Sequence, residues 1–421
     1  MSTFDYSSSR RILGAGYFVS NDARRTGLNN FDVLLGQPGA GKTGGYVIPN
    51  LQILDHSLIV SDTKGNLCRK FRDDLISRGF KVSVLDIVRP EQSCPYNPLM
   101  YIKRYPKGRY REQDVISIAN TLVPIMDKHE PFWEMAARSY LAFLIGYTLE
   151  TEPRERQNLY TVIKKHQQFC DPSKRLEFDV HTTRKPELFS SRKYKQLRGS
   201  MSAEKMWSSI LEFASQSLNI YDTESMLNII GRTDSFDIAS LGREKQVLFL
   251  NVSDTDRTYD NLVNSFYTQA LQTLCAEADG RPDNRLDIPV RMILDDFATN
   301  TRIEDFDKIL SVIRSREIYV SIILQCMSQL ESLYGSSVSK TILNNCDHII
   351  YLGGHDYDTA YYVATHAFTS PEAVLTMRRD KEYVLETGKR GIMFDKIVPY
   401  STIDTVPAEV QLQPSDDAEL Q

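Results

Sequence analysis

The sequence has few cysteines and no long apolar run. Its six cysteines include no CxxC pair and accompany no cluster of histidines, which argues against a structural zinc site and a disulfide framework. We therefore expect reduced, buried thiols in a cytosolic protein. The start, MSTFDYSSSRR, lacks the apolar segment of a signal peptide, and the apolar run at 140–149 is too short to span a bilayer. No transmembrane helix is expected in this chain.

A large excess of one charge is also missing. The chain has 50 basic and 55 acidic residues and a net charge of -5, so any contact with nucleic acid must be local. Hydrophobic residues at 41% and charged residues at 25% are ordinary for a folded protein, which excludes wholesale disorder and a fibrous repeat. The 421 residues are enough for about two or three domains.

Strands and helices alternate in the first hundred residues. Apolar runs at 31–35, 56–62 and 81–86 predict buried strands, and 42–48 and 67–78 predict the helices between them. The proline at position 49 is expected to end or kink the first helix. Such an alternation predicts a mostly parallel sheet with helices on both faces.

The middle of the chain predicts helices alone. Few β-branched runs occur there, and the helix-like stretches are 114–125, 132–149, 159–170, 203–217 and 225–230. Strand patterns then return, with one long helix at 259–278 among them. These later strands are predicted at 245–252, 288–296, 318–325 and 348–353.

Residues 36–43, GQPGAGKT, match the GxxxxGK[ST] pattern of a phosphate-binding P-loop between a predicted strand and a predicted helix. Lys42 is expected to reach the β- and γ-phosphates of ATP, and the Thr43 hydroxyl to ligate Mg²⁺. The preceding loop is expected to curl its backbone around the β-phosphate. Its residues are Gly36, Gln37, Pro38, Gly39, Ala40 and Gly41. A plain glycine turn is the weaker alternative.

The fold class predicted from these patterns is α/β. A P-loop nucleotide domain comprises residues 1–100 and 235–405, and an all-α domain, 101–234, is inserted into it. The acidic tail, 406–421, is predicted to be disordered, either as a solvated terminus or as a segment that docks on a partner.

The stretch RMILDDFA supplies the carboxylates that a P-loop needs. Asp295 ends a predicted buried strand and is expected to hold Mg²⁺, whereas Asp296 is placed to polarise the attacking water. In the alternative interpretation, the pair only caps the next helix.

Two further positions flank the strand at 318–325. Gln325 ends it, where its amide can contact the γ-phosphate or the attacking water; otherwise it is an ordinary polar residue. Arg314 and Arg316 precede it, where an arginine can reach the phosphate of a neighbouring subunit. A surface salt bridge is the alternative for one of them.

Taken together, these stretches resemble the type IV coupling proteins, the ring-forming ATPases of bacterial conjugation and type IV secretion. The similarity covers about residues 30–100, 130–150 and 245–365. It includes GQPGAGKT with VIPNL, SLIVSDTKGNL, VLDIVRPEQSCPYNPL, PFWEMAARSYLAFLI and the stretch of more than forty residues that begins at MILDDFA.

The resemblance implies a RecA-like nucleotide domain and a homo-hexamer around a DNA channel, with the all-α domain at its cytosolic mouth. It implies ATP hydrolysis that recruits or pumps DNA, single-stranded during transfer, with its relaxase complex to a type IV secretion channel at the inner face of the cell membrane. The implied roles are phosphate and Mg²⁺ binding for Lys42 and Thr43, an acidic pair for Asp295 and Asp296, a sensor for Gln325 and a trans-acting finger for Arg314.

Two features depart from the family pattern. Asp296 replaces the usual Glu and is one methylene shorter, which puts the rate of hydrolysis in question. The family usually begins with membrane-spanning helices, so the anchor was lost, was trimmed or is a separate subunit. Both departures motivate an alternative function, a nucleotide-gated adaptor that binds ATP and a transfer partner with little hydrolysis. A small-molecule kinase is disfavoured because no lid-like arginine-rich segment lies near the nucleotide motifs.

Two basic segments are candidates for local contacts with DNA. Residues 183–199 carry six cations against Glu187, with Phe189 and Tyr194 among them, and residues 102–111 form a second cluster with Tyr105 and Tyr110. A solvated surface is the alternative for each segment. The Phe-Trp pair at 132–133 is expected to pack in a core rather than to stack on bases.

Overall fold

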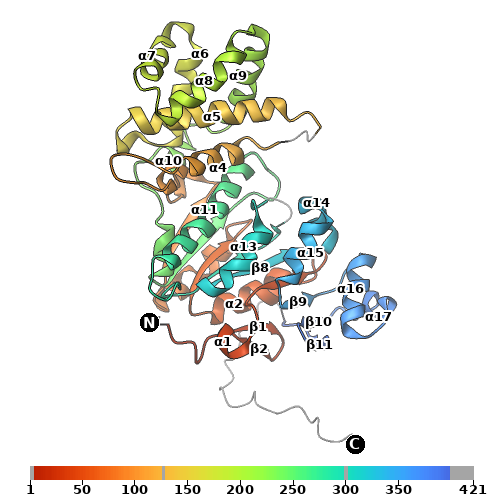
Figure 1. Cartoon of the computed structure of the whole chain (residues 1–421). Coiled ribbons are helices and arrows are strands. Elements are labelled where there is room, and N and C mark those ends of the chain that lie inside the picture. The colour runs from red at the N-terminus through yellow and green to blue at the C-terminus, as the bar shows by residue number, and fades with distance from the viewer. Residues whose placement is uncertain (1–3, 126–128, 298–301, 399–421) are drawn as a thin grey trace, which may run out of the picture.

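Nine strands of the described chain form one twisted sheet in the order β11-β10-β9-β3-β8-β7-β4-β6-β5 (Figure 1). The computed structural model describes residues 4–125, 129–297 and 302–398, so the predicted tail, 406–421, lies outside the described residues. The seven predicted strands are all confirmed and run parallel. They are β3 (Asp32–Leu35), β4 (Ser57–Ser61), β5 (Lys81–Asp86), β6 (Gln246–Asn251), β7 (Val290–Leu294), β8 (Ile318–Leu324) and β9 (His348–Tyr351).

Four strands were not expected. β10 (Lys381–Glu386) pairs antiparallel with β9 and with the edge strand β11 (Ile392–Asp395). An N-terminal hairpin joins β1 (Arg10–Gly14) to β2 (Tyr17–Ser20). β11 is largely exposed and β2 has only four residues, so these two lack the buried apolar run that marks a central strand. β10 does have four buried residues, Glu382–Leu385, but charged residues at both ends and inside the run weaken its strand pattern.

Alternate residues of the central strands enter two apolar cores. Leu34 of β3 shares a core with α2 (Ile48–Ile53) and α3 (Asn66–Ser77) on one face of the sheet. Val33 and Leu35 belong to the core of the other face, which includes side chains of α11 (Asp260–Asp279) and α13 (Phe306–Ile313). This period of two follows from the strand pleat. The remaining helices of the described chain flank the sheet: α1 (Ala23–Thr26), α14 (Met327–Tyr334), α15 (Ser336–Asn344), α16 (Tyr357–Ala367) and α17 (Pro371–Leu375).

Between β5 and β6 the chain forms a helical part that stands away from the sheet, beyond α11 (Figure 1). Its centre is α5 (Phe132–Thr151), whose rings Tyr140 and Phe143 pack in an aromatic core with Phe169 and Phe178. The other helices are α4 (Glu112–Leu122), α6 (Leu159–Cys170), α7 (Leu176–Arg184), α8 (Phe189–Met201), α9 (Glu204–Asn219) and α10 (Leu227–Ile230). α7 and α8 were not predicted, and the domain limits 101 and 234 stay a prediction.

Three local expectations were wrong in whole or in part. Pro49 was expected to end or kink its helix; it does not end it, because a π-helical turn, Thr43–Val47, leads into α2 and places Pro49 in the first turn, where proline is tolerated. Cys170 is exposed, although Cys68 and Cys346 are buried thiols as expected. Phe132 is 51% exposed at the start of α5, and only Trp133 of the pair packs, stacked on Phe213.

Among the described residues, no helix combines the length and the apolar character needed to cross a lipid bilayer.

Candidate functional site

The carboxyl ends of β3, β8 and β7 lie side by side, because these parallel strands are neighbours with Leu35 opposite Leu324 and Leu294 opposite Ile322. The loops that follow them therefore meet at one edge of the sheet. A cavity of about 400 Å³ opens there. Its lining residues are Pro38, Gly39, Gly41, Lys42, Thr43, Gly44, Lys64, Asp295, Asp296 and Gln325. Eight residues predicted to hold or hydrolyse nucleotide are thus brought together: Pro38, Gly39, Gly41, Lys42, Thr43, Asp295, Asp296 and Gln325.

The P-loop has a conformation that requires its glycines. Gly39 and Gly41 have φ values of 78° and 98°, in the left-handed region that side chains disfavour. A Cβ at Gly36 would stand 3.0 Å from Leu352 Cβ, so a larger residue would push the loop away from the strand end. The N–H of Gln37 donates to Gly353 O at 3.1 Å, which ties the loop to the end of β9.

The buried Lys42 ammonium crosses its own loop and donates to Gly36 O at 2.7 Å. A second, longer contact at 3.5 Å reaches Gln37 O. Both acceptors are neutral carbonyls of the loop. An anionic phosphate oxygen is a stronger partner for an ammonium group. The position of Lys42 therefore suits a lysine that transfers from loop carbonyls to a phosphate when nucleotide enters.

Thr43 and Asp295 are in direct contact, with Thr43 Oγ1 donating to Asp295 Oδ2 at 2.7 Å. Burial raises the pKa of Asp295 to about 6; the Thr43 hydrogen bond opposes this shift, and the neighbouring charge of Asp296 adds to it. A hydroxyl and a carboxylate at this distance fit the hard oxygen ligands that Mg²⁺ prefers. The described residues contain no group of three or more His, Cys, Asp or Glu suited to a metal, so the rest of the coordination shell would come from phosphate and water.

The backbone of Asp296 adopts the left-handed conformation, with a φ of 49°, and its N–H donates to Asp295 Oδ1 at 3.1 Å. Aspartate tolerates this conformation better than most residues. The turn places both carboxylates on the cavity. The alternative role as a helix cap involves residues 298–301, which lie outside the described part of the chain.

Gln325 lines the cavity as expected, and its backbone N–H donates to Gln329 Oε1 at 2.8 Å.

Arg314 does not line the cavity. It precedes β8, whose seven residues separate it from the cavity edge by about 20 Å, and its Nη2 donates to Gly27 O at 2.7 Å. Arg316 forms the surface salt bridge that was the alternative, Nε to Asp279 Oδ1 at 2.8 Å. A role for Arg314 on a neighbouring subunit stays a prediction.

Two lysines of the site were missed. Lys64 lines the cavity from the turn after β4, where Gly65 has a φ of 63°; the DTKG sequence after a buried strand was the available signal. Lys396 follows β11, and its Nζ donates to Leu352 O at 2.6 Å and to Ala40 O of the P-loop at 3.2 Å. Nothing local in the sequence marks Lys396, because its partners are more than forty residues away.

A buried ionic cluster lies at the other end of β3, beneath the P-loop. Asp32 accepts from Arg11 Nε at 2.9 Å, from Arg291 Nη1 at 2.9 Å and from the Tyr46 hydroxyl at 2.6 Å. Burial alone would raise the pKa of Asp32, but the two guanidinium groups hold it well below its usual range. Since Tyr46 belongs to the helical turn that follows Thr43, the cluster connects the P-loop to β7.

The sequence model of the family described as "Type IV secretory system Conjugative DNA transfer" matches residues 7–367. No curated protein matches the chain in sequence. The solved structure of the bacterial conjugative coupling protein TrwBdeltaN70, unbound monoclinic form, is similar with a TM-score of 0.67 and 16% identity, over 94% of this chain and 90% of that chain.

Two other solved structures are similar in fold. The plasmid coupling protein TrwB in complex with the ATP analogue ADPNP has a TM-score of 0.67 and 14% identity, over 96% of this chain and 92% of that one. VirB4 of Thermoanaerobacter pseudethanolicus has a TM-score of 0.54 and 14% identity, over 95% and 99%. At these identities the likeness concerns the fold, and it confirms the predicted α/β P-loop class.

The raised pKa of Asp295 leads to a prediction about stability without nucleotide. Below the usual pKa of 3.8, Asp295 is neutral and its burial carries no penalty for ionisation. As the pH rises to about 6, the buried carboxyl group ionises, and the free energy of unfolding falls by at most about 3 kcal/mol. We expect Asp295→Asn to raise the melting temperature at pH 8 and to raise it progressively less as the pH falls toward 4. Thermal melts in EDTA measure this, with the exposed Asp395→Asn as control. An unchanged melting temperature at pH 8 would contradict the burial cost.

Proposed function

The chain belongs to the type IV secretory system conjugative DNA transfer family, and we propose that it is an Mg²⁺-dependent ATPase that recruits or pumps DNA for transfer. The observation that carries the proposal is the contact of Thr43 with Asp295 in a cavity that also holds Lys42. TrwB, which has the same fold, has been solved with ADPNP and with ADP and Mg²⁺. Those complexes support nucleotide binding by this chain.

In the proposed reaction, water attacks the γ-phosphate of ATP and yields ADP and phosphate. Thr43 and Asp295 would hold Mg²⁺, which neutralises phosphate charge when bound. Lys42 would leave the carbonyls of Gly36 and Gln37 for the β- and γ-phosphate oxygens.

Asp296 and Gln325 have the next proposed roles, which are to position the attacking water and to sense the γ-phosphate. Asp296 would orient the attacking water and accept its proton, and the Gln325 amide would contact the γ-phosphate or that water. Arg314 lies at the opposite end of β8, so we propose for it the nucleotide of a neighbouring copy in the hexamer that the family resemblance implies.

Removing the Lys42 ammonium tests the site. Lys42→Ala should lower the ATPase rate at least about a hundredfold, because the charge that stabilises the transferred phosphoryl group is lost. The melting temperature without nucleotide should stay close to that of the wild type, since only two hydrogen bonds to loop carbonyls disappear. Lys340→Ala, an exposed lysine on α15, is the control. Unchanged turnover in Lys42→Ala would reject the site.

The nucleotide-gated adaptor is the second candidate, and the short Asp296 side chain favours it. ATPase assays with and without single-stranded DNA, together with the mass in solution with and without nucleotide, separate the two functions. Strong stimulation by DNA supports the motor. A negligible rate that Asp296→Glu raises supports the adaptor, because the longer carboxylate reaches further toward the water.

A DNA-binding surface on the helical part is also proposed. The two basic segments, 80 positions apart, meet there, since Arg192 Nη2 contacts Glu112 Oε1 at 2.6 Å and the Tyr110 ring packs edge-on against Phe189 at 6.2 Å. Glu150 fastens both segments, accepting from the Tyr110 hydroxyl at 2.7 Å and from Ser190 N at 3.2 Å. We use the name basic face for five exposed cations of the two segments: Lys107, Arg109, Arg111, Arg192 and Lys195.

The aromatic residues of the two segments differ in exposure. Phe189 and Tyr194 are buried and are not free to stack on bases, whereas Tyr105 is 44% exposed. The basic face would therefore contact phosphates through its cations, and Tyr105 is the ring available to a base.

Charge removal on the basic face tests DNA binding. The triple variant Lys107→Ala, Arg109→Ala, Lys195→Ala should weaken binding of a single-stranded oligonucleotide and make the slope of log K against log salt concentration less negative by about 2, at about 0.7 per lost contact. Fluorescence anisotropy at several salt concentrations measures both, with Lys340→Ala as control. If affinity and slope stay at wild-type values, the basic face is only a solvated surface.

The family resemblance supports three further parts of the proposal. The active chain would be a homo-hexamer, with the helical part as an all-α domain over residues 101–234. It would work at the inner face of the cell membrane, through a separate membrane anchor or the secretion channel. Its cargo would arrive with a relaxase complex.

A further inference from the structure

The cavity at the carboxyl edge of the sheet has two cations among its described lining residues, and they come from different strands. Lys42 belongs to the P-loop after β3, and Lys64 belongs to the turn after β4. In the sheet order β3-β8-β7-β4 these two strands are three spacings apart, about 14 Å at about 4.8 Å each. Both lysines nevertheless line the same cavity of about 400 Å³. A ligand of this cavity therefore lies between two ammonium groups.

Lys64 differs from Lys42 in having no partner within the chain. Lys42 donates to the carbonyls of Gly36 and Gln37. The exposed Lys64 side chain forms no hydrogen bond and no ion pair with any residue that the structure describes. A lysine with a purely structural role would be paired with a carboxylate or a carbonyl. The ammonium group of Lys64 is therefore available to a ligand of the cavity.

The turn that carries this lysine has a defined backbone. The buried Asp62 carboxylate accepts from Asn66 N at 3.1 Å and from Cys68 N at 3.0 Å, which joins the turn to the start of α3. Gly65 has a φ of 63°, and a Cβ there would stand 2.7 Å from Arg89 Nη2. Glycine is thus favoured directly after the lysine. The lysine side chain therefore leaves the backbone from a fixed point beside the cavity.

The strand order indicates which phosphate Lys64 faces. In the proposed complex the P-loop curls around the β-phosphate after β3, whereas Asp295 and Asp296, the carboxylates for Mg²⁺ and for the attacking water, follow β7. The triphosphate would then point from β3 toward β7, with the γ-phosphate at the β7 end. β4 is the next strand beyond β7. Lys64 thus approaches from the γ-phosphate end, and Lys42 approaches from the P-loop.

The charges of the site call for a second cation at this end. ATP with Mg²⁺ is still an anion, and Asp295 and Asp296 add negative charge against the single ammonium group of Lys42. Phosphoryl transfer spreads charge over the three equatorial oxygens of the γ-phosphoryl group. Arg314 of the same copy lies at the opposite end of β8 and does not reach them. Within one copy, Lys64 is the second cation that the described lining offers.

We propose that Lys64 binds the γ-phosphate of ATP in the same copy and stabilises its charge during hydrolysis; this inference rests on the ATP site proposed above. In that step the water oxygen bonds to the γ-phosphorus and Asp296 accepts a proton of the water. The bond from the γ-phosphorus to the β–γ bridging oxygen breaks, and its electron pair stays on ADP. Lys64 remains protonated throughout and donates hydrogen bonds to the γ-phosphoryl oxygens. ADP has no γ-phosphate, so its binding does not depend on Lys64.

Nucleotide affinities test this role. With Mg²⁺ present, Lys64→Ala should weaken binding of ADPNP at least about tenfold, because charge-assisted hydrogen bonds to the γ-phosphate are lost. Binding of ADP should change less than about twofold. Lys64→Arg keeps the charge, so its ADPNP affinity should lie closer to the wild type than to Lys64→Ala. Isothermal titration calorimetry on the full chain measures these affinities, with Lys340→Ala as control.

The two nucleotides separate the role of Lys64 from the ATP site itself. If the wild type binds both and Lys64→Ala weakens both equally, or neither, the site stands and the role of Lys64 is overturned. A wild type that binds neither nucleotide would remove the site and the role together. The assay needs no hydrolysis, so it applies to the motor and to the adaptor alike.

Thermal melts without nucleotide complete the test. Lys64→Ala should melt at the wild-type temperature, because the lost ammonium group has no partner in the described part of the chain. A loss of ADPNP affinity then reports on the ligand rather than on the fold. A lowered melting temperature together with loss of both nucleotides would assign Lys64 a structural role instead.

Discussion

The ionic contacts of Asp32 hold the three central strands in register beneath the candidate site. Asp32 on β3 faces Ser321 of β8 in the sheet and receives Arg291 from β7 at 2.9 Å. A buried charge that loses its partner costs several kcal/mol, so β7 cannot slide along the sheet without a large penalty. The carboxyl ends of β3 and β7 therefore keep their relative position, and Thr43 contacts Asp295 at that edge of the sheet. The geometry of the cavity depends on a charge pair that never touches it.

The cavity holds charges that a bound nucleotide would rearrange. The Lys42 ammonium group donates to loop carbonyls. Asp295 is buried beside a second carboxylate, which makes the ionisation of Asp295 costly. A phosphate would give the Lys42 ammonium group an anionic partner. A cation would place a positive charge beside the two carboxylates, so both sets of charges would be stabilised. Lys396 also contacts the loop, and its Nζ donates to Ala40 O at 3.2 Å. Local charge neutralisation is thus part of the free energy that favours nucleotide.

Features with a local signal were predictable from the sequence. The buried parallel strands and the P-loop depend on runs of a few residues, so strands such as β8 were located correctly. The structure also brings Lys42, Thr43 and Asp295 to one cavity, although their roles there stay a prediction. Features that depend on distant partners were not: Lys396 acts on a loop more than 350 positions away, and β11 is defined by pairing rather than by composition. The basic face formed from two predicted segments, but their meeting through Glu112 and Glu150 has no sequence signal.

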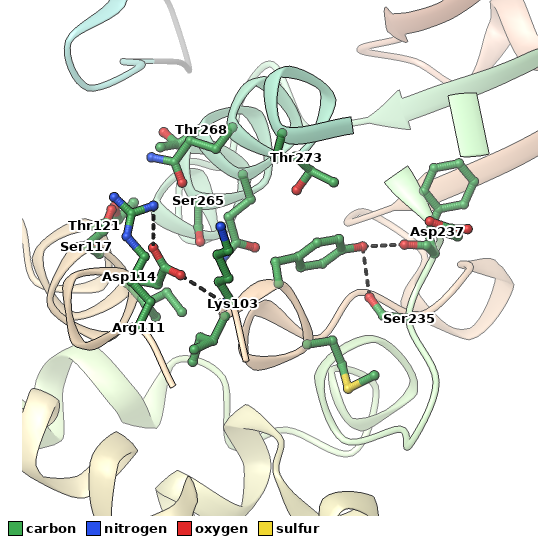
Figure 2. Close-up of a pocket in the computed structure, with 18 residues that line it drawn as sticks. Lys103, Arg111, Asp114, Ser117, Thr121, Ser235, Asp237, Ser265, Thr268 and Thr273 are labelled. Atoms are coloured by element: carbon green, nitrogen blue, oxygen red, sulfur yellow. Dashed lines mark hydrogen bonds and ion pairs between the residues drawn. The ribbon is translucent and has the colours of Figure 1, made fainter. Parts of the chain in front are cut away.

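α11 connects the sheet to the helical part of the chain, which stands beyond it (Figure 1). Its apolar side chains, including Phe266, pack in the core that covers one face of the sheet. Its polar side chains, including Thr268, line two cavities that α4 also borders, the larger of which is shown in Figure 2. Asn264 of the same helix accepts from the backbone N–H of Arg302 at 2.9 Å. Because packed helices shift as units, a displacement of α11 would be passed to the chain at Arg302.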